Sequence, residues 1–235
     1  MKYFILATVG TVMMSSAAFA QDNNTGRNNW GGFYGGVSAG FGSADIDTLF
    51  DPTFSGGGWW TLGGPGAANF DPDGAVVGVH FGYDHMLSEN WYVGIEGSLN
   101  DSSMKQSIAS PAFPTIDTWT AEINNYWTVV GRVGYAMEKV SVYGSVGLAG
   151  ANVKSTAAPP IDISEEHHTG WTAGAGVEYM IRPGLTVGLD YKYLDFGSEL
   201  HLSDTASCGV CARPGDNRNV DVSAQVITAR ISLGF

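Results

Sequence analysis

The sequence is poor in charge, above all in positive charge. Only 14% of its 235 residues are charged, and 11 Lys and Arg stand against 23 Asp and Glu, which gives a formal net charge of −12. An average soluble domain carries about 25% charged residues, so this chain lacks much of the charge that normally covers a soluble surface. Because phosphate contacts require clustered Lys and Arg, the composition also argues against nucleic-acid binding.

Long apolar runs are missing as well. Beyond the N-terminus, no stretch of about 18 or more residues is apolar enough to predict a transmembrane helix. Glycine and aromatic residues are instead plentiful, with 33 Gly and 12% Phe, Trp and Tyr. A disordered chain would be poor in aromatic residues and rich in charge, and a collagen would show a Gly-X-Y repeat, so both classes are excluded.

The N-terminus has the three parts of a secretory signal peptide. Lys2 is basic, residues 4–14 are apolar, and residues 18–20 (Ala-Phe-Ala) form a cleavage site of the small-x-small type. The alternative is an N-terminal membrane anchor, for which the apolar run is too short. We therefore expect a signal peptide at residues 1–20, a polar lead-in at 21–29 and one domain at 30–235.

Apolar side chains recur at every second position in eight segments of the mature chain. Polar or small residues fill the alternate positions, and in a strand successive side chains point to opposite faces of the sheet. Trp127, Val129, Val133 and Tyr135, for example, share one face. The predicted strands lie near residues 30–42, 75–87, 91–103, 124–137, 140–153, 168–181, 185–197 and 223–235.

The connections between these segments alternate between short and long. The short ones are residues 88–90, 138–139 and 182–184, and the long ones lie near 43–74, 104–123, 154–167 and 198–222. Short turns at one end and long loops at the other are typical of bacterial outer-membrane barrels. The apolar face carries no charge in any segment, whereas a soluble sandwich would place charge on its solvent face.

The predicted fold class is all-β: an eight-stranded antiparallel transmembrane β-barrel with short periplasmic turns and four long extracellular loops. The barrel closes because lipid cannot satisfy the hydrogen bonds of an open sheet edge.

Aromatic residues bracket the apolar face. Phe33 and Phe41 are eight residues apart on it, and Trp171 and Tyr179 repeat the spacing. Eight residues of a tilted strand span about 20 Å along a barrel axis, which is close to the ~25 Å apolar band between aromatic girdles. The residues assigned to the girdles are Phe33, Phe41, Tyr83, Trp91, Trp127, Tyr135, Trp171, Tyr179, Tyr191 and Phe235.

The opposite face carries a small set of charges near the middle of the strands. Side chains just fill the interior of an eight-stranded barrel, and buried charges must be paired. We therefore predict a lumen charge network that plugs the barrel, formed by Glu96, Arg132, Glu178, Asp190, Lys192 and Arg230. An ion pathway or a catalytic constellation is the alternative for the same residues. His80 also points inward, and we expect it to form hydrogen bonds there, because Asp84 lies about 13 Å further along the strand.

The loops offer two further groups of reactive side chains. Cys208 and Cys211 lie in the last loop, and because the exported compartment oxidises thiols we predict a local disulfide. A redox role would need a thioredoxin-like context, which the sequence does not show. Zinc would need two more ligands, which His167 and His168 could supply only if their loops meet, so we predict no metal site. The same two histidines are the candidate loop ligand site.

Three motifs resemble those of a known family. Residues 30–42 (WGGFYGGVSAGFG), 190–197 (DYKYLDFG) and 230–235 (RISLGF) are similar to the opening, the penultimate strand and the ending of small alphaproteobacterial outer-membrane proteins of the porin family or outer-membrane protein β-barrel domain group. The resemblance implies a barrel like the transmembrane domain of outer-membrane protein A. Members of the group are described as surface antigens, envelope-stabilising proteins and, in some cases, haemin binders or porins. No catalytic residues come with the resemblance, and the C-x-x-C loop departs from it.

The sequence therefore predicts a protein of the Gram-negative outer membrane that has no cofactor and no catalytic activity. We expect a structural and surface-interaction role, in envelope integrity and in antigen or adhesion contacts through the loops. The alternatives are a small-solute porin, a receptor for haemin or another ligand at His167 and His168, and an outer-membrane enzyme. The expected partners are outer-membrane lipid and lipopolysaccharide, the barrel assembly machinery during biogenesis, and a host or surface ligand, with the protein itself a monomer.

Overall fold

The computed structural model describes residues 30–50, 67–109, 115, 118–158, 162–201 and 218–235. The expected signal peptide at 1–20 and the lead-in at 21–29 lie outside the described residues, as do Cys208 and Cys211 with their expected disulfide. Within these ranges, no helix is long and apolar enough to cross a membrane.

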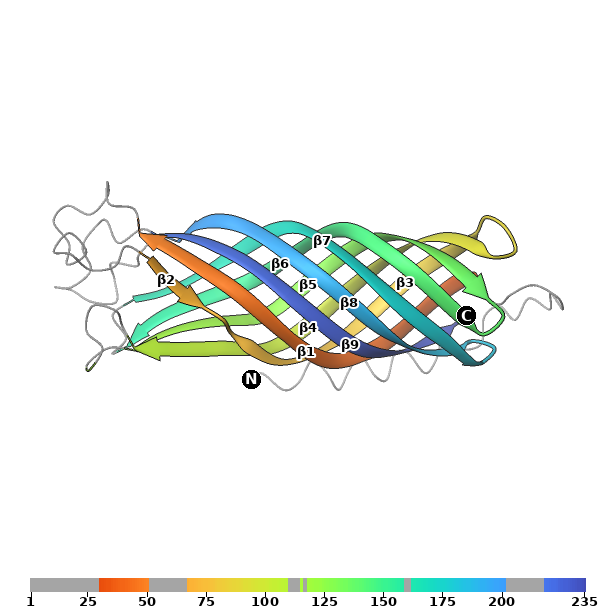
Figure 1. Cartoon of the computed structure of the whole chain (residues 1–235), viewed down its shortest axis with the longest axis horizontal. Helices are drawn as coiled ribbons and strands as arrows, with labels where there is room; N and C mark the ends of the chain where they lie inside the picture. Colours follow the sequence, from red (N-terminus) through yellow and green to blue (C-terminus); the bar gives the residue numbers. More distant parts are fainter. Residues whose placement is uncertain (1–29, 51–66, 110–114, 116–117, 159–161, 202–217) are drawn as a thin grey trace.

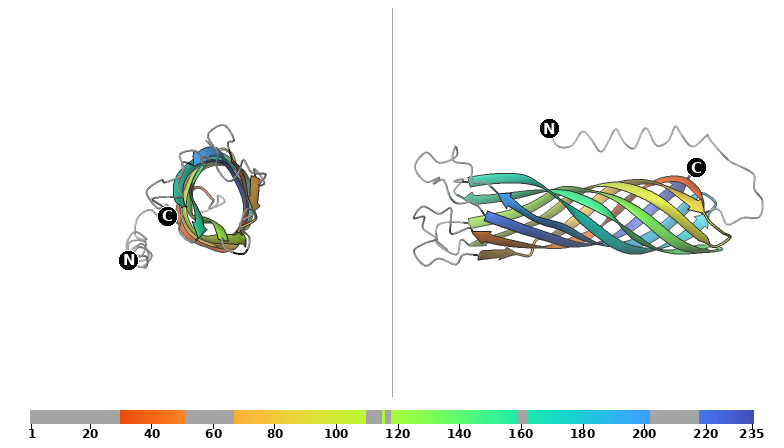
Figure 2. Two further views of the ribbon diagram at one scale, coloured as in Figure 1. Left: turned by 90° about the vertical axis from the view of Figure 1, so that its left-hand side faces the viewer. Right: turned by 90° about the horizontal axis from the view of Figure 1, so that it is seen from above.

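Nine antiparallel strands form one sheet, and this sheet closes into a barrel (Figure 1). They are β1 (Gly32–Phe50), β2 (Ala67–Phe70), β3 (Asp73–Met86), β4 (Trp91–Ala109), β5 (Thr118–Met137), β6 (Val140–Ala158), β7 (Asp162–Arg182), β8 (Leu185–His201) and β9 (Arg218–Gly234). β1 pairs with β9 and closes the ring, for example at Val37 and Ile231, and Figure 2 shows the closed ring from its end. The predicted eight-stranded barrel is confirmed, and the short β2 is an addition that pairs with the last part of β1.

Short turns join the strands at the end of the barrel that holds the C-terminus (Figure 1). They lie between β3 and β4, β5 and β6, and β7 and β8, as the sequence predicts. Gly184, in the last turn, has a φ of +76°, a left-handed conformation that glycine adopts without the steric cost of a Cβ atom. Its carbonyl accepts a hydrogen bond from the backbone N–H of Gly234 at 2.9 Å, which ties this turn to the end of β9.

The outer face of the barrel is apolar around its middle. Val37, Leu148 and Ile231 are 57%, 62% and 50% exposed, because alternate residues of each strand face the outside and the lumen. A soluble monomer rarely exposes a continuous apolar surface of this kind. Lipid provides the apolar surroundings that this face requires.

On the loop side, which is the end opposite the short turns, the strands continue into segments expected to be loops. β1 runs to Phe50 and β7 begins at Asp162, so the loop boundaries expected at 43 and 167 are wrong. The polarity of the two faces is reversed here, since Ile46 and Val222 point inward and are only 2% and 0% exposed. The surroundings explain the reversal: beyond the lipid the outer face meets water, and the interior becomes the apolar side.

Candidate functional site in the barrel interior

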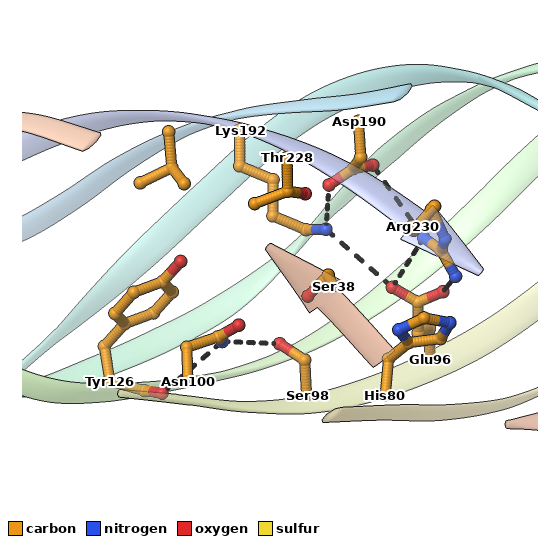
Figure 3. A pocket seen from close by; sticks show the side chains of 11 residues that line it. Ser38, His80, Glu96, Ser98, Asn100, Tyr126, Asp190, Lys192, Thr228 and Arg230 are labelled. Atoms are coloured by element: carbon orange, nitrogen blue, oxygen red, sulfur yellow. Dashed lines mark hydrogen bonds and ion pairs between the residues drawn. The ribbon is translucent and has the colours of Figure 1, made fainter. Parts of the chain in front are cut away.

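The charged residues assigned to the lumen lie inside the barrel and come from five of its strands. Glu96, Arg132, Glu178, Asp190 and Arg230 are at most 6% exposed. They project from β4, β5, β7, β8 and β9, at inward positions of the two-residue repeat. Lys192 lies beside them on β8, with a side chain that is 12% exposed. Figure 3 shows Glu96, Asp190, Lys192 and Arg230 pointing toward one another in the interior.

Glu96 is the centre of this group. Its Oε2 accepts hydrogen bonds from Arg230 Nη2 at 2.6 Å and from Arg132 Nη1 at 3.0 Å. Glu178 pairs with the same two guanidinium groups, at 3.2 Å from Arg132 Nη2 and 3.3 Å from Arg230 Nε. Two carboxylates and two guanidinium groups thus form a closed circuit of ion pairs, in which every charge is compensated although water is almost excluded.

Lys192 and Asp190 extend the network along β8 (Figure 3). The Lys192 ammonium group donates to Asp190 Oδ1 and lies 3.8 Å from Glu96 Oε1. Asp190 also lies 4.0 Å from Arg230 Nη1 and accepts a hydrogen bond from the Tyr143 hydroxyl at 2.6 Å. All six residues assigned to the network from the sequence are therefore brought together.

Three inward tyrosines also belong to the network, and sequence reasoning missed them. Tyr34 donates to Glu96 at 2.9 Å, and the Tyr92 hydroxyl accepts a hydrogen bond from Arg132 at 3.0 Å. The Arg132 guanidinium carbon lies 4.1 Å from the centre of the Tyr143 ring, a distance at which the ring face attracts the cation. The tyrosine hydroxyl groups pair with hydrogen-bond donors and acceptors of the charged side chains that the ion pairs do not use.

Each of these tyrosines faces a glycine on the next strand. The register pairs are Tyr34 with Gly82, Tyr92 with Gly134 and Tyr143 with Gly176. A Cβ atom on Gly134 would lie 2.2 Å from Tyr92 Cζ, and one on Gly176 would lie 2.3 Å from Tyr143 Cζ. Glycine is needed because the aromatic ring crosses directly over the neighbouring backbone. This recurring pairing of an inward tyrosine with an inward glycine is the signal that could have revealed the three residues.

Asp84 adds a carboxylate that the sequence analysis left out of the network. It is 5% exposed and lies 3.5 Å from Arg132 Nε. The predicted set balances three acids against three bases, whereas the interior with Asp84 holds one more carboxylate than cationic side chains. His80 forms a hydrogen bond with the Ser232 hydroxyl at 2.8 Å, as expected for a histidine inside the lumen.

The network leaves little free space. A cavity of about 20 Å³ is lined by Glu96, Asn100 and Lys192 among others (Figure 3). A second cavity of about 50 Å³ is lined by Trp30 and Asp84 among others. One water molecule needs about 10–15 Å³ of such space, so the cavities have room for one and for a few water molecules respectively.

Apolar side chains fill the interior on both sides of the network. On the loop side, Ile46, Met104, Ile123, Leu194 and Phe196 belong to one cluster, and none of them is more than 2% exposed. A smaller cluster at the turn end contains Trp30, Tyr92, Ala136, Tyr143 and Met180. Across the described residues the interior therefore consists of a polar layer between two apolar layers.

The aromatic residues assigned to the turn-side girdle lie on the outer face. Phe33 and Tyr83 have ring centres 4.7 Å apart, and Trp91 and Tyr135 have ring centres 5.2 Å apart. Tyr179 and Phe235 are exposed at the same end. Aromatic pairs at these separations attract one another.

The loop-side group is less regular. Phe41 and Trp171 are 71% and 47% exposed, whereas Trp127 is half-buried and its ring lies against Gly150. Tyr191 pairs in register with Ala175, halfway between the two aromatic groups. The assignment of Tyr191 to a girdle is therefore wrong, because its outward position indicates its face and not its depth.

His167 and His168 lie on β7 rather than in a loop. As neighbours on a strand they point to opposite faces: His167 is exposed and contacts Asn152 Oδ1 at 2.9 Å, whereas His168 has 0% exposure. The loop ligand site built from both residues is therefore wrong, since they cannot reach one ligand together. The Nε2 atom of His168 instead lies 2.8 Å from Nε2 of His201, a residue that sequence reasoning did not single out.

Comparisons with known proteins agree with this architecture. The family model of the outer membrane protein beta-barrel domain matches residues 4–235. A 31 kDa outer-membrane immunogenic protein of Brucella melitensis is 31% identical over 177 residues, which are 72% of this chain and 69% of that protein. A 22 kDa outer membrane protein of Rhizobium leguminosarum is 31% identical over 166 residues, which are 66% of this chain and 73% of that protein. The crystal structure of the outer membrane protease OmpT from Escherichia coli is similar in fold alone, with a TM-score of 0.50 and 8% identity over 87% of this chain and 97% of that chain.

Proposed function

The chain belongs to the outer membrane protein beta-barrel domain family, and from this premise we propose that it is a closed barrel with a structural and surface-interaction role. It contributes to envelope integrity and presents antigenic or adhesive contacts through its loops. Residues 1–20 act as the signal peptide that exports it. The barrel itself sits in outer-membrane lipid, and we propose that it contacts lipopolysaccharide and is inserted as a monomer by the barrel assembly machinery.

The occlusion of the interior carries this proposal. The ion pairs around Glu96 cross the lumen from β4 to β9, and the cavities beside them have volumes of only about 20 and 50 Å³. The apolar cluster that includes Ile123 and Phe196 covers the loop side of the network. A hydrated solute would have to displace both layers, so a role on the outside of the barrel is favoured over transport through it.

The names of the relatives support the surface part of the proposal. The Brucella protein is named an immunogenic protein of the outer membrane, which describes a protein that meets the immune system. For this chain the corresponding contacts would be made by the segments that connect the strands on the loop side. Binding residues in general lie disproportionately on loops that a rigid scaffold carries.

Conductance of the purified protein in a planar bilayer tests the occlusion. We expect no stable current steps after insertion, because the ion pairs and the apolar cluster block the lumen. A large open porin added to the same bilayer is the control that shows the sensitivity of the measurement. Reproducible single-channel steps would instead favour the small-solute channel.

A separate experiment tests the surface role. In cells that lack the gene, the full chain should restore resistance to detergent, and so should a version in which residues 202–217 are replaced by a short Gly-Ser linker. Antibodies raised against intact cells should recognise the full chain more strongly than the shortened version. Equal recognition would argue against this loop as the contact surface, and failure of both chains to restore resistance would argue against the structural role.

A further inference from the structure

A slot on the outer face of the barrel crosses three neighbouring strands. Its volume is about 340 Å³, and its lining comes from β3, β4 and β5. Gly97 on β4 lies in register between Phe81 on β3 and Val129 on β5. A Cβ atom on Gly97 would meet nothing closer than Thr128 O at 3.9 Å. The missing side chain therefore leaves open space above the backbone, between the bulky side chains of the two neighbouring strands.

The slot lies in the half of the apolar band that is nearer the loops. Val129 is two residues from Trp127 in the loop-side aromatic group and six residues from Tyr135 in the turn-side girdle. In an outer-membrane barrel the long loops are extracellular, so the slot faces the outer leaflet, whose lipid is lipopolysaccharide. Because the slot continues the lipid-facing surface of the barrel, hydrocarbon fills it.

A row of polar side chains crosses the same face immediately beyond the slot, toward the loops. Asn125, two residues from Trp127 on β5, pairs in register with Asn152 on β6, which pairs with His167 on β7. Asn152 Nδ2 donates to Asn125 Oδ1 at 2.8 Å, and His167 Nδ1 lies 2.9 Å from Asn152 Oδ1. Asn125 and His167 are exposed. The row spans three strands and is about 10 Å wide, which is comparable with the length of a disaccharide.

We propose that the slot and this polar row together bind one molecule of lipopolysaccharide at a fixed position. An acyl chain lies in the slot over Gly97, and sugar hydroxyl and amide groups of the lipid A head form hydrogen bonds with Asn125, Asn152 and His167. This site rests on the proposed contact with lipopolysaccharide and gives that contact a place on the barrel.

The polar row provides the preference for this lipid. Apolar shape alone would not retain it, because in a bilayer the competing chains are equally apolar. Asp101, in register beside Asn125, is exposed, and its carboxylate repels phosphate. The row therefore favours a head that offers neutral hydroxyl and amide groups over a phospholipid head, in which phosphate is the main hydrogen-bonding group.

The test counts the lipids bound to the full chain by native mass spectrometry in a mild detergent, with lipid A and phosphatidylethanolamine titrated separately and together. We expect one lipid A per barrel, held about tenfold more tightly than phosphatidylethanolamine, because each hydrogen bond contributes a factor of roughly two to ten. Asn125→Ala should weaken lipid A binding by about threefold or more, and Gly97→Leu, which fills the slot, should weaken it at least as much. Gly144→Leu is the matched control: Gly144 has similar open space, with Gly174 O nearest at 3.9 Å, but lies outside the slot.

Cross-saturation from the acyl chains of lipid A to the methyl groups of the barrel, in deuterated detergent, locates the lipid without a substitution. Val129 should receive more magnetisation than Leu189, which is 59% exposed on β8 and outside the slot. Equal transfer to both residues would overturn the site. Equal affinity for the two lipids would do the same, and so would parent affinity in a Gly97→Leu barrel whose gel mobility still shifts on heating.

Two outcomes separate this site from the proposed function. Lipid A binding that depends on neither Gly97 nor Asn125 would overturn the site but leave the contact with lipopolysaccharide elsewhere on the barrel. If the parent binds no lipid A, both the site and that contact are wrong, whereas the closed barrel is tested separately by its conductance.

Discussion

Glu96 makes more of the buried contacts inside the barrel than any other acid described above. It accepts hydrogen bonds from Arg132, Arg230 and Tyr34 while it is only 2% exposed. In Glu96→Gln the side chain keeps its size but loses its charge, so two buried guanidinium groups lose a compensating partner. Because removing one member of a buried ion pair costs about 3–5 kcal/mol, we expect a loss of this order in the free energy of unfolding by urea in lipid vesicles.

An exposed ion pair provides the matched control for this prediction. Lys105 Nζ lies 2.6 Å from Glu122 Oε1, and the two side chains are 57% and 23% exposed. Solvent screens such a pair, which is worth about 0–1 kcal/mol, so Glu122→Gln should change the stability far less than Glu96→Gln. Similar losses of unfolding free energy in Glu96→Gln and Glu122→Gln would show that the interior network does not stabilise the barrel more than an exposed ion pair does.

At the scale of neighbouring strands, the pairing of an inward tyrosine with a glycine fixes how closely two strands and their side chains pack. A Cβ atom on Gly134 would lie 2.2 Å from Tyr92 Cζ, whereas one on the outward-facing Gly97 would come no closer than 3.9 Å to Thr128 O. Gly134→Ala should therefore displace the Tyr92 ring and cost about 1–3 kcal/mol, and Gly97→Ala should stay within about 0.5 kcal/mol. The unfolding free energies of both variants in the same vesicles check this, and equal values would contradict the close approach.

Strand faces can be predicted from the sequence more reliably than strand ends. The alternation around Trp171 and Tyr179 identifies both faces of β7, and the charges at inward positions identify most of the network. The ends were missed because the polarity of the two faces reverses beyond the lipid, as at Ile46. Register shifts between Ile123 and Asn125 and between Asp195 and Ser198 also break the two-residue count. Depth along the barrel and the contacts between strands, such as that of His168 on β7 with His201 on β8, depend on the register and not on the alternation.

The whole molecule is longer than the membrane that it crosses. β4 has 19 residues, and a strand of this length tilted by about 40° spans roughly 50 Å along the barrel axis, which is about twice the ~25 Å apolar band. The remainder extends beyond the lipid on the loop side, where the apolar cluster that includes Phe196 fills the interior. This part of the barrel therefore needs its own apolar core, as a soluble β-protein does.

Truncation of Phe196 to alanine should lower the free energy of unfolding of the barrel, although Phe196 lies outside the lipid. Phe196 is 1% exposed, and Phe→Ala in a packed core costs about 3–5 kcal/mol, which urea unfolding in vesicles would measure. Leu148→Ala is the control: this side chain is 62% exposed on the outer face, where lipid chains can fill the space that it leaves.

Hydrogen exchange provides the second readout, because the amides of Ile123, Val153 and Val222 should exchange slowly in the parent and faster in Phe196→Ala. Rapid exchange of these amides in the parent would mean that the strands are not ordered beyond the lipid. The apolar cluster on the loop side could then not close the lumen, and the argument for occlusion would fail.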